Sequence, residues 1–112
     1  MKLAEPFTFF LDRSLGGAFV AGALRAAGHA VAVHDDQFAP DATDIEWLTA
    51  VGARGWVVLT KDARIRTNSL ERETLLSANV AAFMLGRGDM NGPQMATAFL
   101  TALARMAKVL RR

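Results

Sequence analysis

The sequence alternates short apolar segments with segments of helical periodicity, and this alternation is the feature that most constrains the fold. We predict strands at residues 7–11, 30–34, 56–60 and 80–85. We predict helices at residues 14–27, 43–55, 69–78 and 93–110. Such a pattern favours parallel strands with helices on both faces and right-handed crossovers. The length of 112 residues fits one domain. We therefore expect a single three-layer α/β/α domain, residues 1–112, around a four-stranded parallel sheet.

Local signals support the predicted helix starts. Thr43 and Glu46 match a capping box, with Thr43 as the N-cap of the second helix. Ser69 is a suitable N-cap for the third helix, and Pro93 suits the first position of the last one. These signals place the helices after loops that follow the strands.

Several predicted strands run into acidic residues. Asp12 follows the first strand, Asp35 and Asp36 follow the second, and Asp62 lies just beyond the third. The carboxyl ends of parallel strands form the rim where ligands bind in an open α/β sheet. Clustered carboxylates, without cysteine and with two histidines, suit a hard cation such as Mg²⁺ or Mn²⁺. We therefore predict functional roles for Asp12 and Asp62, against the alternatives of a helix cap, a salt bridge to Arg13 or a turn.

The first turn of the second predicted helix carries Asp44 and Glu46. The capping box and the helix dipole explain both residues, and a helix start at the rim can also direct one of them at a metal. The two side chains face different directions because they are two positions apart, so the choice between them stays open. We expect the loop acids Asp35, Asp36 and Asp41 to be solvated. A turn explains Asp89, with an extension of the acidic site as the alternative.

Basic residues accompany the two principal acids. Arg13 is adjacent to Asp12, and Lys61, Arg64 and Arg66 flank Asp62. They can be a solvated surface that neutralises the acids, or a frame for phosphates that positions a nucleic acid without reading its sequence. The net charge of +2 is compatible with either interpretation.

Other kinds of site are excluded or disfavoured by composition. The chain has no cysteine, which excludes disulfides and thiolate metal sites. His29 and His34 match no common zinc spacing, and no glycine-rich phosphate loop is present. No apolar run approaches the roughly 20 residues of a membrane span, and the first residues do not resemble a secretory signal. We therefore expect a cytoplasmic protein that does not enter membranes.

Four short motifs, in order, resemble those of the PIN-like nucleases, in particular the short toxins of bacterial toxin–antitoxin pairs. They are FLD at residues 10–12, LRAAGH at 24–29, DATDIEWL at 41–48 and VVLTKD at 57–62. The resemblance covers about the first two-thirds of the chain. It implies the PIN-like fold with strand order 2-1-3-4.

The resemblance also implies an activity and a set of site residues. A protein of this family is expected to be a Mg²⁺- or Mn²⁺-dependent ribonuclease that hydrolyses RNA phosphodiester bonds and is paired with a protein antitoxin. Asp12, Asp62 and either Asp44 or Glu46 would be the catalytic and metal-binding acids. Arg13, Lys61, Arg64, Arg66 and Asn68 would contact the substrate.

One departure from the family pattern keeps a second function open. Many PIN proteins carry a further acid after the third one, but residues 63–68 contain none, and Asn68 would be its neutral substitute. A catalytically inactive PIN-like binding or regulatory module is therefore the alternative, and a phosphoryl-accepting receiver-like domain is a third hypothesis. A homodimer is compatible with the apolar stripe of the last helix, which core packing explains equally well: Met95, Phe99, Met106 and Leu110.

Overall fold

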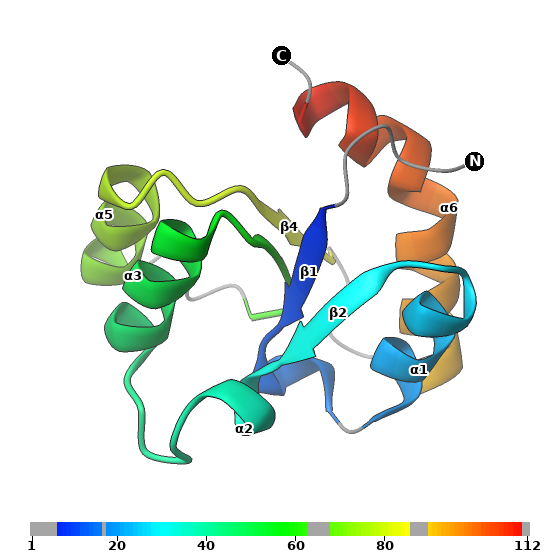
Figure 1. Ribbon diagram of the computed structural model, residues 1–112, viewed down its shortest axis with the longest axis horizontal. Helices are drawn as coiled ribbons and strands as arrows, with labels where there is room; N and C mark the ends of the chain where they lie inside the picture. Colours follow the sequence, from blue (N-terminus) through cyan, green and yellow to red (C-terminus); the bar gives the residue numbers. More distant parts are fainter. Residues whose placement is uncertain (1–6, 17, 63–67, 86–89, 111–112) are drawn as a thin grey trace.

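The computed structural model describes residues 7–16, 18–62, 68–85 and 90–110. Its centre is a four-stranded parallel sheet in the order β2-β1-β3-β4, as predicted (Figure 1). The strands are β1 (Thr8–Leu11), β2 (Ala30–Val33), β3 (Val57–Thr60) and β4 (Ala82–Met84). The sequence-based prediction of the fold class is therefore confirmed.

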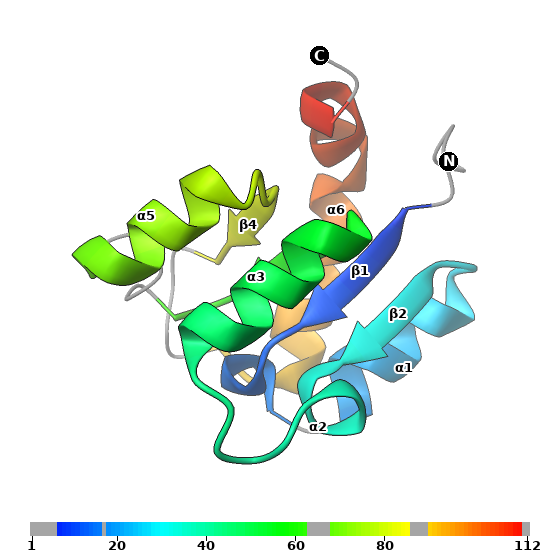
Figure 2. The same ribbon diagram turned by 60° about the vertical axis from the view of Figure 1, so that its left-hand side comes forward.

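Helices cover both faces of the sheet. α1 (Ala18–Ala26) and α6 (Gly92–Leu110) pack together on one face, and α3 (Asp44–Arg54) and α5 (Ser69–Ser77) pack together on the other (Figures 1 and 2). Two short helices, η1 (Arg13–Leu15) and α2 (His34–Gln37), directly follow the ends of β1 and β2. No helix in the described part of the chain is long and apolar enough to cross a membrane.

Alternate side chains of β1 build the two cores, because successive residues of a strand point to opposite faces. Phe9 lies in the core beneath α1 and α6, together with Leu24 and Phe99. Phe10 lies in the core beneath α3, together with Trp47. All four residues of β3 are buried, which agrees with the prediction that this strand is central.

This arrangement fixes where a ligand can bind. The helix after β1 lies on one face of the sheet, whereas the helix after β3 lies on the other. The neighbouring ends of β1 and β3 are thus a topological switch point, the place where ligands bind in open α/β sheets. Asp12 and Asp62 follow these two strand ends.

The first predicted helix is two elements. We expected one helix over residues 14–27, but η1 ends at Gly16, whose φ of 77° lies in the left-handed region. α1 then begins at Ala18. Glycine adopts this backbone at little cost, so the chain turns here before the longer helix starts.

The prediction for His34 and the following loop was also wrong. His34 begins α2 instead of ending β2, and residues 34–37 form a single helical turn in which the Phe38 N–H donates to the His34 carbonyl. The two acids of this turn, Asp35 and Asp36, lie in its first part, where the helix dipole favours negative charge.

The helix caps agree with the predictions in part. Thr43 caps α3 through its hydroxyl, which accepts a 3.1 Å hydrogen bond from the Glu46 N–H. α5 is capped by Asn68 rather than Ser69, because the Asn68 Oδ1 accepts from two backbone N–H groups.

The apolar stripe of α6 is part of the core. Met95, Phe99 and Met106 are buried against the sheet, and Leu110 packs beside them. Core packing, one of the two explanations we considered, therefore accounts for the stripe. A homodimer has no support from this surface.

Candidate active site

Asp12 lies at the carboxyl end of β1 and is almost completely buried, with 7% of its surface exposed. Its Oδ1 accepts hydrogen bonds from the Ser14 N–H at 3.0 Å and from the Ser14 hydroxyl. Its Oδ2 accepts a bond of 2.5 Å from the Thr60 hydroxyl at the end of β3. The carboxylate also caps the N-terminus of η1. The role of helix cap, which we considered as an alternative for Asp12, is therefore observed as well. These bonds fix Asp12 at the switch point.

The same hydroxyls tie the ends of β1 and β3 together. Ser14 Oγ and Thr60 Oγ1 are 3.1 Å apart. The Lys61 N–H donates to Ser14 Oγ at 3.0 Å, and the Asp62 N–H donates to Thr60 Oγ1 at 2.9 Å. Ser14 and Thr60 therefore order the segments that carry Asp12 and Asp62.

The electrostatics of Asp12 result from competing effects. Burial raises the pKa of the Asp12 carboxyl above its ordinary value, because it disfavours the charged form. The hydrogen bonds from Ser14 and Thr60 oppose this shift, and the negative charge of Asp62 adds to it. The ionised carboxylate of Asp12 would therefore be favoured by a nearby positive charge.

A cavity of about 350 Å³ opens at this point and brings together carboxylates from three segments. Asp12 comes from the end of β1, Asp44 from the first turn of α3, and Asp62 from the chain beyond β3. The remaining lining residues are Arg13, Ser14, His34 and Trp47.

Asp44 and Glu46 differ in position. Asp44 is half-buried, and its Oδ1 accepts a hydrogen bond of 2.8 Å from the indole Nε1 of Trp47. Trp47 is itself 2% exposed and packs against Phe10, so it holds Asp44 toward the cavity. Glu46 is exposed, and the cavity lining within the described residues does not include it. The geometry therefore favours Asp44 as the third acid of the site.

The structure describes some, but not all, of the predicted substrate-binding residues. Arg13 lines the cavity, and Lys61 adjoins it through its backbone bond to Ser14. Arg64 and Arg66 lie outside the described residues, as does Asp89. The side-chain oxygen of Asn68 caps α5 through bonds of 3.1 Å to the N–H groups of Leu70 and Glu71. Its oxygen thus has a structural use.

The cavity fits a hard divalent cation, because its lining offers the carboxylate oxygens of three acids and the hydroxyl oxygen of Ser14. Within the described residues, no three acidic or histidine side chains stand close enough to hold one ion between them. Mg²⁺ usually needs only one or two carboxylates, with water and substrate phosphate completing its coordination. The residues present meet that requirement.

His34 also lines the cavity, which the sequence did not indicate. It is 2% exposed and packs among aromatic rings, including an edge-on contact with Trp47. Its Nδ1 lies 3.1 Å from Asp35 Oδ1, whereas its Nε2 has no hydrogen-bond partner in the described part of the molecule. The only sequence signal was its position between an apolar strand and two acids.

Comparison with known proteins gives the class to which this fold and site belong. A family model described as "PIN like domain" matches residues 7–87, and the chain belongs to this family. The chain is 33% identical over 113 residues to the protein named "Putative ribonuclease VapC45" from Mycobacterium tuberculosis. The match covers 97% of this chain and 82% of that relative. No solved structure matches the chain at a significant level.

Proposed function

We propose that this protein is a divalent-metal-dependent endoribonuclease. The observation that carries the proposal is the convergence of Asp12, Asp44 and Asp62 on one cavity at the switch point of a PIN-like sheet. The similarity to a relative whose name describes a ribonuclease supports RNA as the substrate.

One or two of these carboxylates, with water and substrate phosphate, would hold Mg²⁺ or Mn²⁺, which would supply an activated water and neutralise charge at the phosphate when it is bound. The residues of the chain prepare this site. Ser14 and Thr60 hold Asp12, and the Trp47 indole holds Asp44. Such supporting bonds orient the ligands of a metal.

Cationic side chains would bind the RNA backbone beside the acids. Arg13 lines the cavity, and its guanidinium suits phosphate because its donors match phosphate oxygens in pairs. Lys61, Arg64 and Arg66 would extend the contact along the strand, as their sequence positions indicate. Contacts of this kind position RNA without selecting its sequence.

The likeness to the short PIN-like toxins leads us to propose a biological setting as well. The protein would act on cytoplasmic RNA and would be restrained by a cognate protein antitoxin. An antitoxin that blocks the cavity would have to cover Asp12, Asp44 and Asp62.

The experiment is incubation of the purified protein with a mixed structured RNA in Mn²⁺, Mg²⁺ or EDTA. We expect cleavage at internal positions with either metal, and none in EDTA. Cleavage that continues unchanged in EDTA would contradict metal dependence. No cleavage under any condition, with the protein folded, would favour the alternative of an inactive PIN-like binding module.

A further inference from the structure

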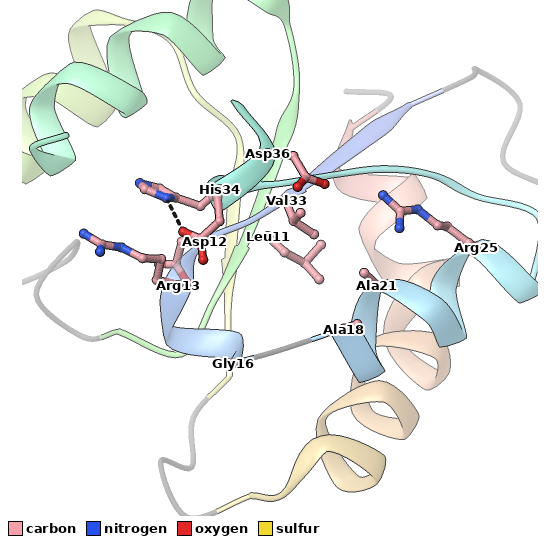
Figure 3. A pocket seen from close by; sticks show the side chains of 11 residues that line it. Leu11, Asp12, Arg13, Gly16, Ala18, Ala21, Arg25, Val33, His34 and Asp36 are labelled. Carbon is pink, nitrogen blue, oxygen red and sulfur yellow. Dashed lines mark hydrogen bonds and ion pairs between the residues drawn. The ribbon is translucent and has the colours of Figure 1, made fainter. Parts of the chain in front are cut away.

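A second cavity, of about 230 Å³, lies beside the acid cavity, between the carboxyl ends of β1 and β2 (Figure 3). Its inner wall is apolar. Leu11 and Val33 project from the two strands toward Ala18 and Ala21 of α1. Six charged or polar side chains also line the cavity, so that it offers an apolar face for a ring and polar groups for the edge of that ring: Asp12, Arg13, Arg25, His34, Asp35 and Asp36.

The two cavities share one wall. Asp12, Arg13 and His34 line both of them. In Figure 3 the side chains of Arg13 and His34 extend away from α1. An RNA strand with a phosphate at the acids would therefore bring an adjoining nucleotide to the second cavity.

Opposite charges face each other across the second cavity. Arg25 reaches over it from α1, and Asp36 reaches over it from α2 (Figure 3). The Arg25 Nη2 donates to the Val31 carbonyl at 2.9 Å, which holds the guanidinium near the rim. Within the described residues, no ion pair joins Arg25 and Asp36. A ligand that offers donors to Asp36 and an acceptor to Arg25 would bridge them.

We propose that this cavity is a subsite for a guanine base of the RNA substrate. The inference rests on the proposed ribonuclease function and adds a base preference to it. Guanine presents two adjacent donors, N1–H and N2–H, which match the two oxygens of the Asp36 carboxylate. Its O6 and N7 are acceptors, and arginine binds them as a pair.

The other bases match the Asp36 carboxylate and the Arg25 guanidinium less well. On their Watson–Crick edges, adenine and cytosine each place one amino group beside an acceptor, which would face the second oxygen of Asp36. Uracil has a single N–H between two carbonyls. RNA-binding proteins commonly read the exposed edges of unpaired bases in this way. The cavity volume lies below the roughly 300–1,000 Å³ of sites for larger ligands, which agrees with occupation by one base.

The experiment measures binding separately from cleavage. Guanosine, inosine, adenosine, cytidine and uridine are titrated into the protein in EDTA, and the backbone amide signals are followed by NMR. We expect guanosine to shift signals at Ala18, Ala21 and Val33. Inosine, which lacks the 2-amino group, should bind at least about fivefold more weakly. The variant Asp36→Asn should lose the preference for guanosine over the other nucleosides. Asp41→Asn, in an exposed loop outside the cavity, should keep this preference.

A second readout uses the cleaved RNA. We expect guanine to be enriched beside the cut sites of the wild type and of Asp41→Asn, but not of Asp36→Asn. If the protein cuts RNA but shows no guanine preference in nucleoside binding or beside the cut sites, the proposed subsite is wrong and the proposed ribonuclease activity is not affected. If guanosine binds in a way that depends on Asp36 but the protein cuts no RNA, the result would support the guanine subsite and contradict the proposed ribonuclease activity. The absence of guanosine binding up to its solubility limit would also overturn the subsite.

Discussion

The Thr60 hydroxyl donates a hydrogen bond of 2.5 Å to the Oδ2 of Asp12, a residue 48 positions away in the sequence. The bond joins the ends of β1 and β3 at the point where the helices change faces. Thr60 is completely buried, so both partners are shielded from water. The bond thus links the stability of the sheet to the position of the candidate metal ligand.

Replacing Thr60 with valine removes this donor while keeping the shape of the side chain. Because a buried carboxylate then loses a partner, we expect Thr60→Val to lower the free energy of unfolding by about 1–3 kcal/mol at pH 7. Urea denaturation measures this change. Thr49→Val is the matched control, because Thr49 is exposed and its hydroxyl donates to the Ile45 carbonyl of its own helix. Equal effects of the two substitutions would contradict the role given to Thr60.

The raised pKa of Asp12 predicts a pH dependence of stability in metal-free protein. Burial is its main cause, so the folded state binds a proton at Asp12 more tightly than the unfolded state does. The contribution of Asp12 to stability is therefore greatest below the ordinary pKa of 3.8 and falls as the pH rises through the folded-state pKa.

Asp12→Asn removes the titrating carboxyl. The free energy of unfolding of the variant, relative to that of the wild type, should therefore increase as the pH rises from 3.8 through the folded-state pKa of Asp12. Urea denaturation in EDTA at a series of pH values measures the difference. A difference that does not change with pH, or that decreases, would contradict the raised pKa.

A divalent ion should stabilise the folded protein, because it would relieve the repulsion between Asp12 and Asp62. At a hundredfold excess over its Kd, Mn²⁺ should add about 2.7 kcal/mol. Thermal unfolding in Mn²⁺ and in EDTA measures the shift in Tm. Asp41→Asn should respond as the wild type does, and Asp12→Asn should respond less. The same Tm in Mn²⁺ and EDTA for the wild type would contradict metal binding by these acids.

Asp44 and Glu46 provide a matched pair of substitutions in one helical turn. Both acids lie in the first turn of α3, so their removal costs similar helix-dipole energy. We expect Asp44→Asn to lower the rate of RNA cleavage at least about tenfold, because only Asp44 lines the cavity. Glu46→Gln should stay within about twofold of the wild type. The reverse order of effects would assign the third acid to Glu46.

Much of the fold could be predicted from the sequence, because the signals are local. The alternation of apolar and helical segments indicated the parallel sheet. The position of Asp12 and Asp62 after the first and third strands indicated that they would lie close together, and both line one cavity. The strand order came from the resemblance to PIN-like proteins and not from periodicity.

The finer features of the site depend on contacts between distant segments. Ser14 resembles a helix cap and Thr60 an ordinary strand residue until β1 and β3 lie side by side. The choice of Asp44 over Glu46 depends on which side of α3 faces the switch point. The hydrogen bond from the Trp47 indole to Asp44 indicates that side, and it could not be predicted from the sequence. His34 was missed because its strand gives way to a helical turn.

We propose that Asp12 and Asp62 form a metal-dependent site that cuts RNA. The most direct measurement is the single-turnover rate of RNA cleavage in Mn²⁺ for the wild type, Asp12→Asn, Asp62→Asn and the control Asp41→Asn, each shown to be folded by circular dichroism. We predict that Asp12→Asn and Asp62→Asn lower the rate at least about 100-fold, because loss of a ligand should cost no less than loss of its supporting bonds. Asp41→Asn should cut as fast as the wild type. Cleavage at the wild-type rate by Asp12→Asn and Asp62→Asn would show that these two acids do not form the catalytic site.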